Sequence, residues 1–303
     1  MTKIFPQSNS LDFTEKLVKC NNGYELGKIH KTKFANGEIT VVIEESVRNE
    51  SIVIVSQPRN YEDIFELCET IDAARRASAK EIIGIIPYLP HSRQERREEG
   101  VRTTISARLF ADMLQVAGLN RLITMDVHTT AIEGFYTIPF DNLDPSDVLI
   151  EKIKSLNLTN PVIVSPDLGG MKRAKKYAKA LGYGLAIIDK ERKKANEVDT
   201  MTLIGDVKNS DVILVDDMID TGGTILKAID VLKENGANNS YVFAAHGLFS
   251  GSATTKFAAC KHDPKVYTTN TLSFPEDKIK YTTFEEVNVV GEFYKAIKKV
   301  FSV

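Results

Sequence analysis

The chain has 303 residues, 43% of them hydrophobic and 26% charged, which is enough to bury a sizeable core and favours two domains over one. Its formal net charge of −2 excludes a general attraction to nucleic acid or membrane surfaces, so a local cluster of donors must bind any anion. No run approaches the roughly 20 apolar residues that a membrane span requires.

The cysteines and the N-terminus indicate the compartment. Cys20, Cys68 and Cys260 lie far apart, are odd in number and form neither a CxxC pair nor a Cys/His metal-binding spacing. The first ten residues, MTKIFPQSNS, lack the apolar segment of a secretory signal. We therefore expect a cytoplasmic protein with reduced thiols and with neither a nucleic-acid nor a membrane partner.

Short β-branched runs alternate with helical patterns along the whole chain. The expected strands cover residues 51–58, 81–88, 121–128, 161–167, 211–217 and 239–246. The expected helices cover residues 63–79, 106–118, 169–182 and 222–236. Continuous apolar strands between helices are typical of an α/β fold with a buried parallel sheet.

The order of elements repeats in both halves, and the stretch DNLDPSD (141–147) between them has the turn chemistry of a linker. We predict two similarly wound domains, residues 1–145 and 146–303, with the last helix a candidate to pack back on the first domain.

Polar residues follow the expected strands. In open parallel sheets, ligands bind beyond the carboxyl ends of the strands. The residues expected at such ends are Asp126, His128, Asp167, Asp216 and Asp217.

One string, VILVDDMIDTGGTI (212–225), combines an acid pair with a candidate phosphate cradle. Asp220, Thr221, Gly222, Gly223 and Thr224 form a turn whose backbone N–H groups open a helix, and the glycines permit close approach of an anion. Asp216 and Asp217 are suited to accept from a vicinal diol or to hold a divalent cation through water. The alternative is an ordinary strand-to-helix turn capped by Thr221.

The segment VDDMIDTGGT (215–224) closely resembles the phosphoribosyl diphosphate (PRPP) loop of type I phosphoribosyltransferases. The wider set of signatures resembles the ribose-phosphate diphosphokinase, or PRPP synthetase, family from residue 34 to residue 271. These signatures are FANGE (34–38), PYLPHSRQERR (87–97), TMDVHTTAIEGFY (124–136), SPDLGGMKRA (165–174), IDKERKKAN (188–196) and TNT (269–271).

This resemblance implies two phosphoribosyltransferase-like domains, each a mainly parallel sheet flanked by helices. The first would contact ATP and other subunits, and the second would hold ribose 5-phosphate and a catalytic lid. The implied reaction transfers the diphosphoryl group of ATP to the 1-hydroxyl of ribose 5-phosphate, giving PRPP and AMP. Such a reaction depends on charge neutralisation and alignment, and the implied cofactor is Mg²⁺.

The resemblance assigns residues to ATP and the metal. Arg93, Gln94 and Arg96 become ATP contacts, although by pattern alone their run of charges reads as a solvated helix start. His128 and Asp167 become the residues that serve the magnesium, and His128 is also expected in catalysis. By itself, a lone histidine at a strand end is more often structural.

Lys190 and Arg192 match a catalytic lid that closes over the reacting phosphates and excludes water. Position 191 usually holds arginine in the family but holds Glu191 here, which leaves the effect on lid closure open.

Phe34, Asn36 and Glu38 match the loop that receives adenine, by stacking and by accepting hydrogen bonds from its amine. Asn36 replaces the usual aspartate, so base selectivity is open. Because this loop reaches the nucleotide of a neighbouring subunit in the family, a homo-oligomer with shared nucleotide sites is implied.

Two alternatives remain: a PRPP-consuming phosphoribosyltransferase and a non-catalytic, synthetase-like regulatory subunit. The C-terminal segment 287–297 has no serine where many family members use a serine-rich segment in regulation. Oligomer size, activation by phosphate and inhibition by ADP are therefore left open.

Overall fold

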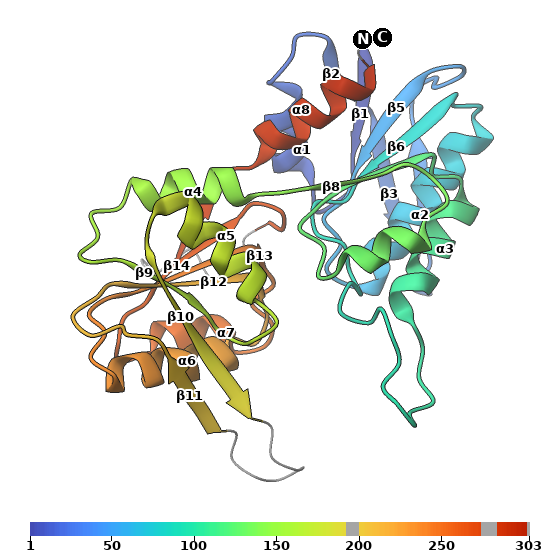
Figure 1. Cartoon of the computed structure of the whole chain (residues 1–303). Coiled ribbons are helices and arrows are strands. Elements are labelled where there is room, and N and C mark those ends of the chain that lie inside the picture. The colour runs from blue at the N-terminus through green and yellow to red at the C-terminus, as the bar shows by residue number, and fades with distance from the viewer. Residues whose placement is uncertain (192–199, 274–283, 302–303) are drawn as a thin grey trace. The chain divides into compact units, whose positions relative to one another are not determined.

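The computed structural model describes residues 1–191, 200–273 and 284–301 (Figure 1). The chain divides into two compact units. Unit 1 contains Met1–Asp144, Thr271–Ser273 and the C-terminal helix α8 (Val290–Phe301). Unit 2 contains the described residues from Pro145 to Asn270 together with strand β15 (Phe284–Val287).

Unit 1 is built on a six-stranded, fully parallel sheet with the order β2-β1-β5-β6-β7-β8. The strands are β1 (Thr2–Pro6), β2 (Tyr24–Leu26), β5 (Ser51–Val55), β6 (Glu81–Ile85), β7 (Arg121–Met125) and β8 (Phe140–Leu143). The central strands are almost continuously apolar and buried, as expected of a parallel sheet with covered faces.

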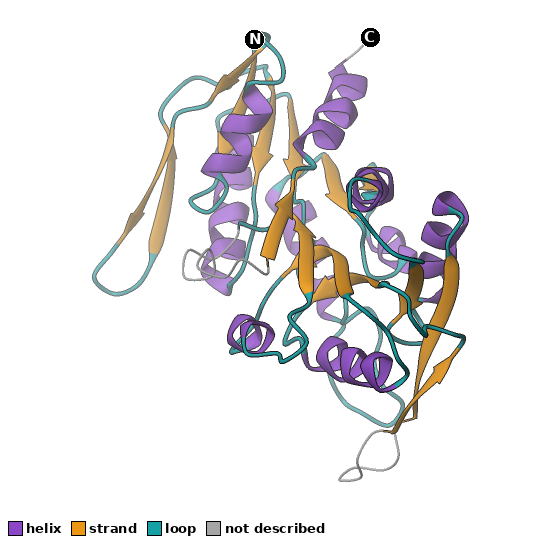
Figure 2. Cartoon of the chain, turned by 90° about the vertical axis from the view of Figure 1, so that its left-hand side faces the viewer, coloured by secondary structure: helices purple, strands orange, loops and turns teal. Residues whose placement is uncertain are grey.

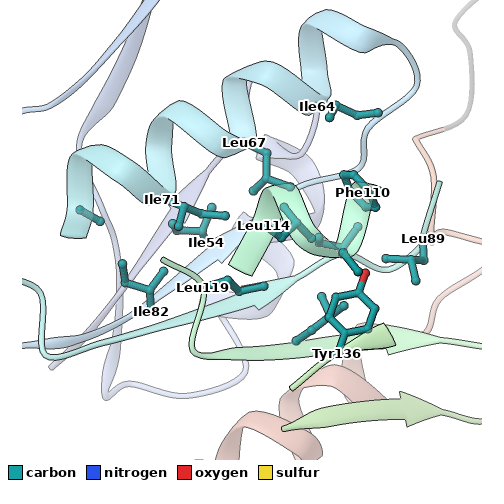
Figure 3. Close-up of a cluster of buried hydrophobic side chains, with 14 of the residues drawn as sticks. Ile54, Ile64, Leu67, Ile71, Ile82, Leu89, Phe110, Leu114, Leu119 and Tyr136 are labelled. Carbon is teal, nitrogen blue, oxygen red and sulfur yellow. The ribbon is translucent and has the colours of Figure 1, made fainter. Parts of the chain in front are cut away.

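Helices cover this sheet: α1 (Leu11–Val18), α2 (Tyr61–Arg76), α3 (Ser106–Ala117), the short 3₁₀ helix η1 (Thr130–Phe135) and α8. Figure 3 shows the core that α2 and α3 share with the strands, in which Leu67, Ile71 and Leu114 are completely buried. Helix α8 packs on α1, and the rings of Phe13 and Phe293 meet edge to face at 5.4 Å.

A hairpin of two antiparallel strands, β3 (Ile29–Lys33) and β4 (Ile39–Ile43), forms a separate two-stranded sheet (Figure 2, left). This hairpin was not predicted from the sequence. An Asn-Gly step between β-branched runs is a strong hairpin signal, and Asn36-Gly37 supplies it, with Gly37 at φ +90°.

Unit 2 is built on a seven-stranded sheet with the order β11-β10-β9-β12-β13-β14-β15. All neighbours are parallel except β10 and β11. The remaining strands are β9 (Val162–Ser165), β10 (Gly184–Glu191), β11 (Thr200–Ile204), β12 (Val212–Ile219), β13 (Ser240–Gly247) and β14 (Lys265–Thr269). The helices are α4 (Ser146–Lys154), α5 (Met171–Leu181), α6 (Gly223–Glu234) and α7 (Ala253–Ala258).

The predicted α/β class with mainly parallel sheets is confirmed, and all ten expected elements are present. Their predicted ends were wrong by up to three residues. Strand β9 ends at Ser165 because Pro166 has no N–H to donate, and β7 ends at Met125 because Asp126 takes φ +45°. Strand β12 instead runs two residues beyond Asp217, since its pairing with β13 continues to Ile219. No helix in the described residues is long and apolar enough to cross a membrane.

Candidate active site

The acid pair of unit 2 lies inside strand β12 and not after it. Asp217 is 7% exposed, and its backbone N–H donates to Oδ1 of Asp216 at 2.8 Å. Burial, followed by the charge of Asp217, raises the pKa of Asp216 well above its usual value. Two carboxylates held this close repel each other, so hydroxyl donors or a cation placed beside them would relieve that repulsion.

The cradle, residues 220–224, joins β12 to helix α6. Gly222 takes φ +74°, and a Cβ there would lie 2.6 Å from Cε2 of Phe257. The carbonyls of Ile219 and Asp220 accept from the backbone N–H groups of Leu248, Phe249 and Ser250, which fixes the turn. The first amides of α6 have no acceptor within the helix, so they can serve an anion.

The alternative of a turn capped by Thr221 is wrong. The N-cap of α6 is Gly222, and no side chain makes a cap hydrogen bond there. Thr221 and Thr224 are exposed, and Gly223 is half-buried. At Gly223 a Cβ would meet nothing closer than Oγ1 of Thr221 at 4.0 Å, so this glycine leaves space beside the cradle.

Asp167 lies at the same sheet edge as the acid pair, because β9 and β12 are parallel neighbours. Its side chain is exposed, and its Oδ1 accepts from the N–H of Gly170 at 2.8 Å. Ser165 donates from its hydroxyl to the Asp167 carbonyl at 2.7 Å. The charge of Asp167 also contributes, after burial and Asp217, to the raised pKa of Asp216.

In unit 1, His128 follows β7 at the carboxyl edge of the sheet and is exposed. Two hydrogen bonds hold the backbone that leads to His128. The Asp126 N–H donates to the Leu143 carbonyl at 2.9 Å, and the Val127 N–H donates to Oδ1 of Asn142 at 3.2 Å. The unusual φ of Asp126 turns the chain sharply at this edge.

Arg93, Gln94 and Arg96 lie in the loop between β6 and α3, which leaves the same sheet edge as His128 because β6 and β7 are parallel neighbours. The reading of this run as a helix start is wrong, since α3 begins only at Ser106. All three side chains are exposed, and the Gln94 carbonyl accepts from the N–H of Ala107 at 3.3 Å. Their exposure places guanidinium and amide donors at the protein surface.

Phe34, Asn36 and Glu38 form the tip of the β3–β4 hairpin, which we call the hairpin tip (residues 34–38). Phe34 is 51% exposed, so part of its ring is accessible to a stacking partner. Two hydrogen bonds stabilise the turn at the tip. The Phe34 N–H donates to the Glu38 carbonyl at 2.8 Å, and the Glu38 N–H donates to Oδ1 of Asn36 at 3.1 Å.

Lys190 is half-buried near the end of β10, where its backbone pairs with Met201 of β11. Arg192 lies outside the described residues. The structure therefore brings the acid pair, the cradle and Asp167 to one edge of the unit 2 sheet. In unit 1, it brings His128 and the loop carrying Arg93 to one edge of that sheet.

Two residues that shape the site were missed from sequence. Phe257 of α7 lies against the cradle, and Ser165 of β9 orients the backbone at Asp167. A Cβ at Gly170 would lie only 2.8 Å from the Ser165 hydroxyl. No local signal marks either residue, because each acts through a tertiary or turn contact.

Within the described residues, no three histidine, cysteine, aspartate or glutamate side chains are grouped so that they could hold a metal ion together. A cation here would need ligands from substrate and water, which is the usual situation for Mg²⁺ at phosphates.

The mainly parallel sheet of unit 2, with an acid pair in the strand that leads to a glycine cradle, defines an α/β protein of the phosphoribosyl-binding class. Two family models match the chain: the N-terminal domain of ribose phosphate pyrophosphokinase over residues 2–118 and the phosphoribosyl transferase domain over residues 146–262.

Individual proteins match over most of the length. A ribose-phosphate pyrophosphokinase from Wolinella succinogenes is 42% identical over 302 residues, covering 99% of this chain and 96% of the relative. One from Ralstonia nicotianae is 42% identical over 277 residues, covering 90% and 87%. The crystal structure of phosphoribosylpyrophosphate synthetase from Mycobacterium smegmatis aligns with a TM-score of 0.91 at 35% identity, covering 99% of both chains. The chain belongs to the ribose-phosphate pyrophosphokinase family.

Proposed function

We propose that the protein transfers the diphosphoryl group of ATP to the 1-hydroxyl of ribose 5-phosphate, forming PRPP and releasing AMP. One observation carries this proposal: the phosphoribosyl loop belongs to a chain that matches ribose-phosphate pyrophosphokinases along 99% of its length, unit 1 included. A PRPP-consuming transferase needs the loop but not unit 1. A non-catalytic subunit is disfavoured because Lys190, Arg192 and His128 are all retained.

Unit 2 is proposed to hold ribose 5-phosphate. The cradle amides and the Thr221 and Thr224 hydroxyls bind the 5-phosphate, and Asp216 and Asp217 accept from the ring hydroxyls. This division follows from the chemistry, since carboxylates repel a phosphate but suit a diol. It also orients the sugar, because its two ends are held by different groups.

Unit 1 is proposed to hold ATP. Arg93 and Arg96 bind phosphate oxygens, Gln94 adds neutral hydrogen bonds, and the hairpin tip receives the base through Phe34 and Glu38. Oδ1 of Asn36 already accepts a hydrogen bond from the Glu38 N–H within the tip. It is therefore a weaker acceptor for the adenine amine than an oxygen without that bond. The preference of the enzyme for adenine over other bases should therefore be measured.

Mg²⁺ is the proposed cofactor, held by His128 and Asp167 together with phosphate oxygens and water. The residues fit it, because exposed Asp167 adds its charge to those of Asp216 and Asp217, and a cation would offset these like charges. When bound, the ion neutralises charge on the triphosphate.

Lys190 and Arg192 are proposed to stabilise the negative charge that develops on the transferred diphosphoryl group and on the phosphate of the departing AMP. They are also proposed to exclude water from these groups. Glu191 lowers the net positive charge of this segment. The active assembly is proposed to be a cytoplasmic homo-oligomer whose nucleotide sites are completed by the hairpin tip of a neighbouring copy.

The decisive experiment supplies ATP, Mg²⁺ and ribose 5-phosphate and measures both products over time. We expect AMP and PRPP in equal amounts, with label from both the β and the γ phosphate of ATP appearing in PRPP. Formation of ADP, or of AMP without PRPP, contradicts the proposal. Activity seen only after addition of a catalytic partner indicates the regulatory-subunit alternative.

A further inference from the structure

The β3–β4 hairpin hydrogen-bonds to neither large sheet, although it carries the hairpin tip at its far end. An isolated two-stranded hairpin is marginally stable in water, so its direction must be set by packing against the rest of unit 1. Apolar contacts act at both ends: half-buried Ile29 and Ile43 pack on the core at the base, and Ile39, next to the tip, is 8% exposed. Apolar contacts are not directional, so a polar contact between the hairpin and α2 would define the angle of the hairpin more sharply.

A partly buried ion pair, in which the Lys31 side chain is 20% accessible and that of Glu66 5%, supplies a directional contact. Nζ of Lys31, on β3, lies 2.8 Å from Oε2 of Glu66 and 3.2 Å from Oε1 of Glu62, both on α2. Glu66 is only 4% exposed, and its other oxygen accepts from both the N–H and the hydroxyl of Ser8 at 2.8 Å each. Its carboxylate thus joins β3, α2 and the segment after β1.

The ammonium of Lys31 is charged in this position. Burial opposes its charge, but the hydrogen bonds and the charges of Glu66 and Glu62 together outweigh burial and raise the pKa of Lys31. An ion pair with one buried partner contributes little net stability, yet its hydrogen-bond geometry favours one arrangement of the hairpin over others.

Lys33 provides an internal comparison. It lies two residues further along β3, so on the same face, and its Nζ is 2.5 Å from Oε2 of Glu62. Here both partners are well exposed, with 54% and 36% of their side chains accessible. Exposed pairs of long side chains restrain geometry weakly.

We propose that Lys31 and Glu66 are positioning residues that fix the hairpin so that Phe34 and Glu38 meet the nucleotide base. This rests on the proposed function of the hairpin tip. It predicts that loss of the Lys31 charge frees the tip and weakens ATP binding, whereas loss of the Lys33 charge does neither.

The direction of the hairpin can be measured without any assay of activity. The chain has no tryptophan, so Phe34→Trp places a single tryptophan at the tip, which can be excited selectively in the presence of the tyrosines. In that background, Lys31→Met should increase the amplitude of nanosecond motion in time-resolved anisotropy, and Lys33→Met should leave it unchanged. Equal anisotropy decays in all three proteins overturn the role of Lys31 in fixing the hairpin, independently of the reaction that the enzyme catalyses.

Steady-state kinetics of proteins that keep Phe34 then test whether the Lys31–Glu66 pair serves ATP binding. Lys31→Met should raise KM for ATP about tenfold with little change in kcat, and Lys33→Met less than about twofold. The preference for ATP over inosine triphosphate, which lacks the exocyclic amine, should shrink, and Lys31→Arg should largely restore it. A mobile tip with unchanged KM for ATP and unchanged base preference overturns the proposal while leaving the diphosphoryl transfer intact.

Discussion

Gly222 and Phe257 are in contact across the cradle, and the ring leaves no room for a side chain at the glycine: an added Cβ would lie 2.6 Å from Cε2. The φ of +74° adds a second restriction, since a residue with a Cβ is strained there. The neighbouring Gly223 has neither restriction.

The two glycines should therefore differ on substitution. Gly222→Ala should lower the free energy of unfolding by about 2–4 kcal/mol, from backbone strain plus overpacking against Phe257. Gly223→Ala should leave it within about 0.5 kcal/mol but raise KM for ribose 5-phosphate about tenfold, because its methyl group would occupy space beside the cradle. Chemical denaturation and steady-state kinetics measure both. Equal destabilisation by the two changes would show that the contact with Phe257 is unimportant.

Asp216→Asn should stabilise the ligand-free protein while abolishing activity. The folded-state pKa of Asp216 is raised by burial and then by Asp217, so the folded state holds more protons than the unfolded state between the two pKa values. Stability contributed by this group is therefore lost as pH rises from about 4 through the raised pKa. At pH 8, in chelator, we expect the variant to melt about 3 °C higher than the parent, and at pH 4 to show no gain.

Asp206→Asn is the matched control, because it is the same change at an exposed position of unit 2. Its melting temperature should follow the parent at both pH values. A gain for Asp216→Asn that does not depend on pH would assign the effect to packing and not to charge.

Asp167→Asn should raise the Mg²⁺ concentration for half-maximal activity about tenfold. The amide oxygen can still accept from the Gly170 N–H, so the backbone should keep its conformation while the charge is lost. Activity is titrated against Mg²⁺ at saturating ATP, and melting in chelator controls for folding. An unchanged Mg²⁺ requirement would remove Asp167 from the metal site.

Lys190→Ala should reduce kcat about 100-fold or more and change the dissociation constant of ATP much less, because the cation acts on charge that develops during transfer. Single-turnover kinetics and equilibrium ATP binding separate the two quantities. Lys179→Ala, on the exposed side of α5, should leave both unchanged. Weaker ATP binding with full turnover at saturation would make Lys190 a ground-state contact.

The sequence predicts those parts of the fold whose signal is local. Buried apolar strands and glycine-ended helices gave ten elements, and a glycine-rich turn after an acid pair gave the cradle. The true end of β12 was missed because it depends on pairing with β13, which extends the strand past two charged residues. Phe257 was missed for a similar reason: its effect on Gly222 exists only after α7 packs on the cradle.

The residues proposed to bind ATP and the metal were harder to predict from the sequence. Phe34, Arg93 and His128 have no local pattern that distinguishes a ligand contact from an exposed side chain, and their assignment came from family resemblance alone. The hairpin that carries Phe34 had a local signal in Asn36-Gly37, but its anchor did not, since Lys31 and Glu66 are 35 residues apart and meet only through tertiary packing.

The return of the chain to unit 1 affects how the protein is made. Phe293 is completely buried against Phe13, yet α8 is synthesised only after all of unit 2. At ordinary translation rates, the nascent unit 1 waits roughly 10–30 s with the α1 surface uncovered. During that time, the exposed face of α1 is available to chaperones or to other unfinished chains. A fragment ending at Asp144 would carry the same exposed face permanently, so unit 1 should be expressed together with α8.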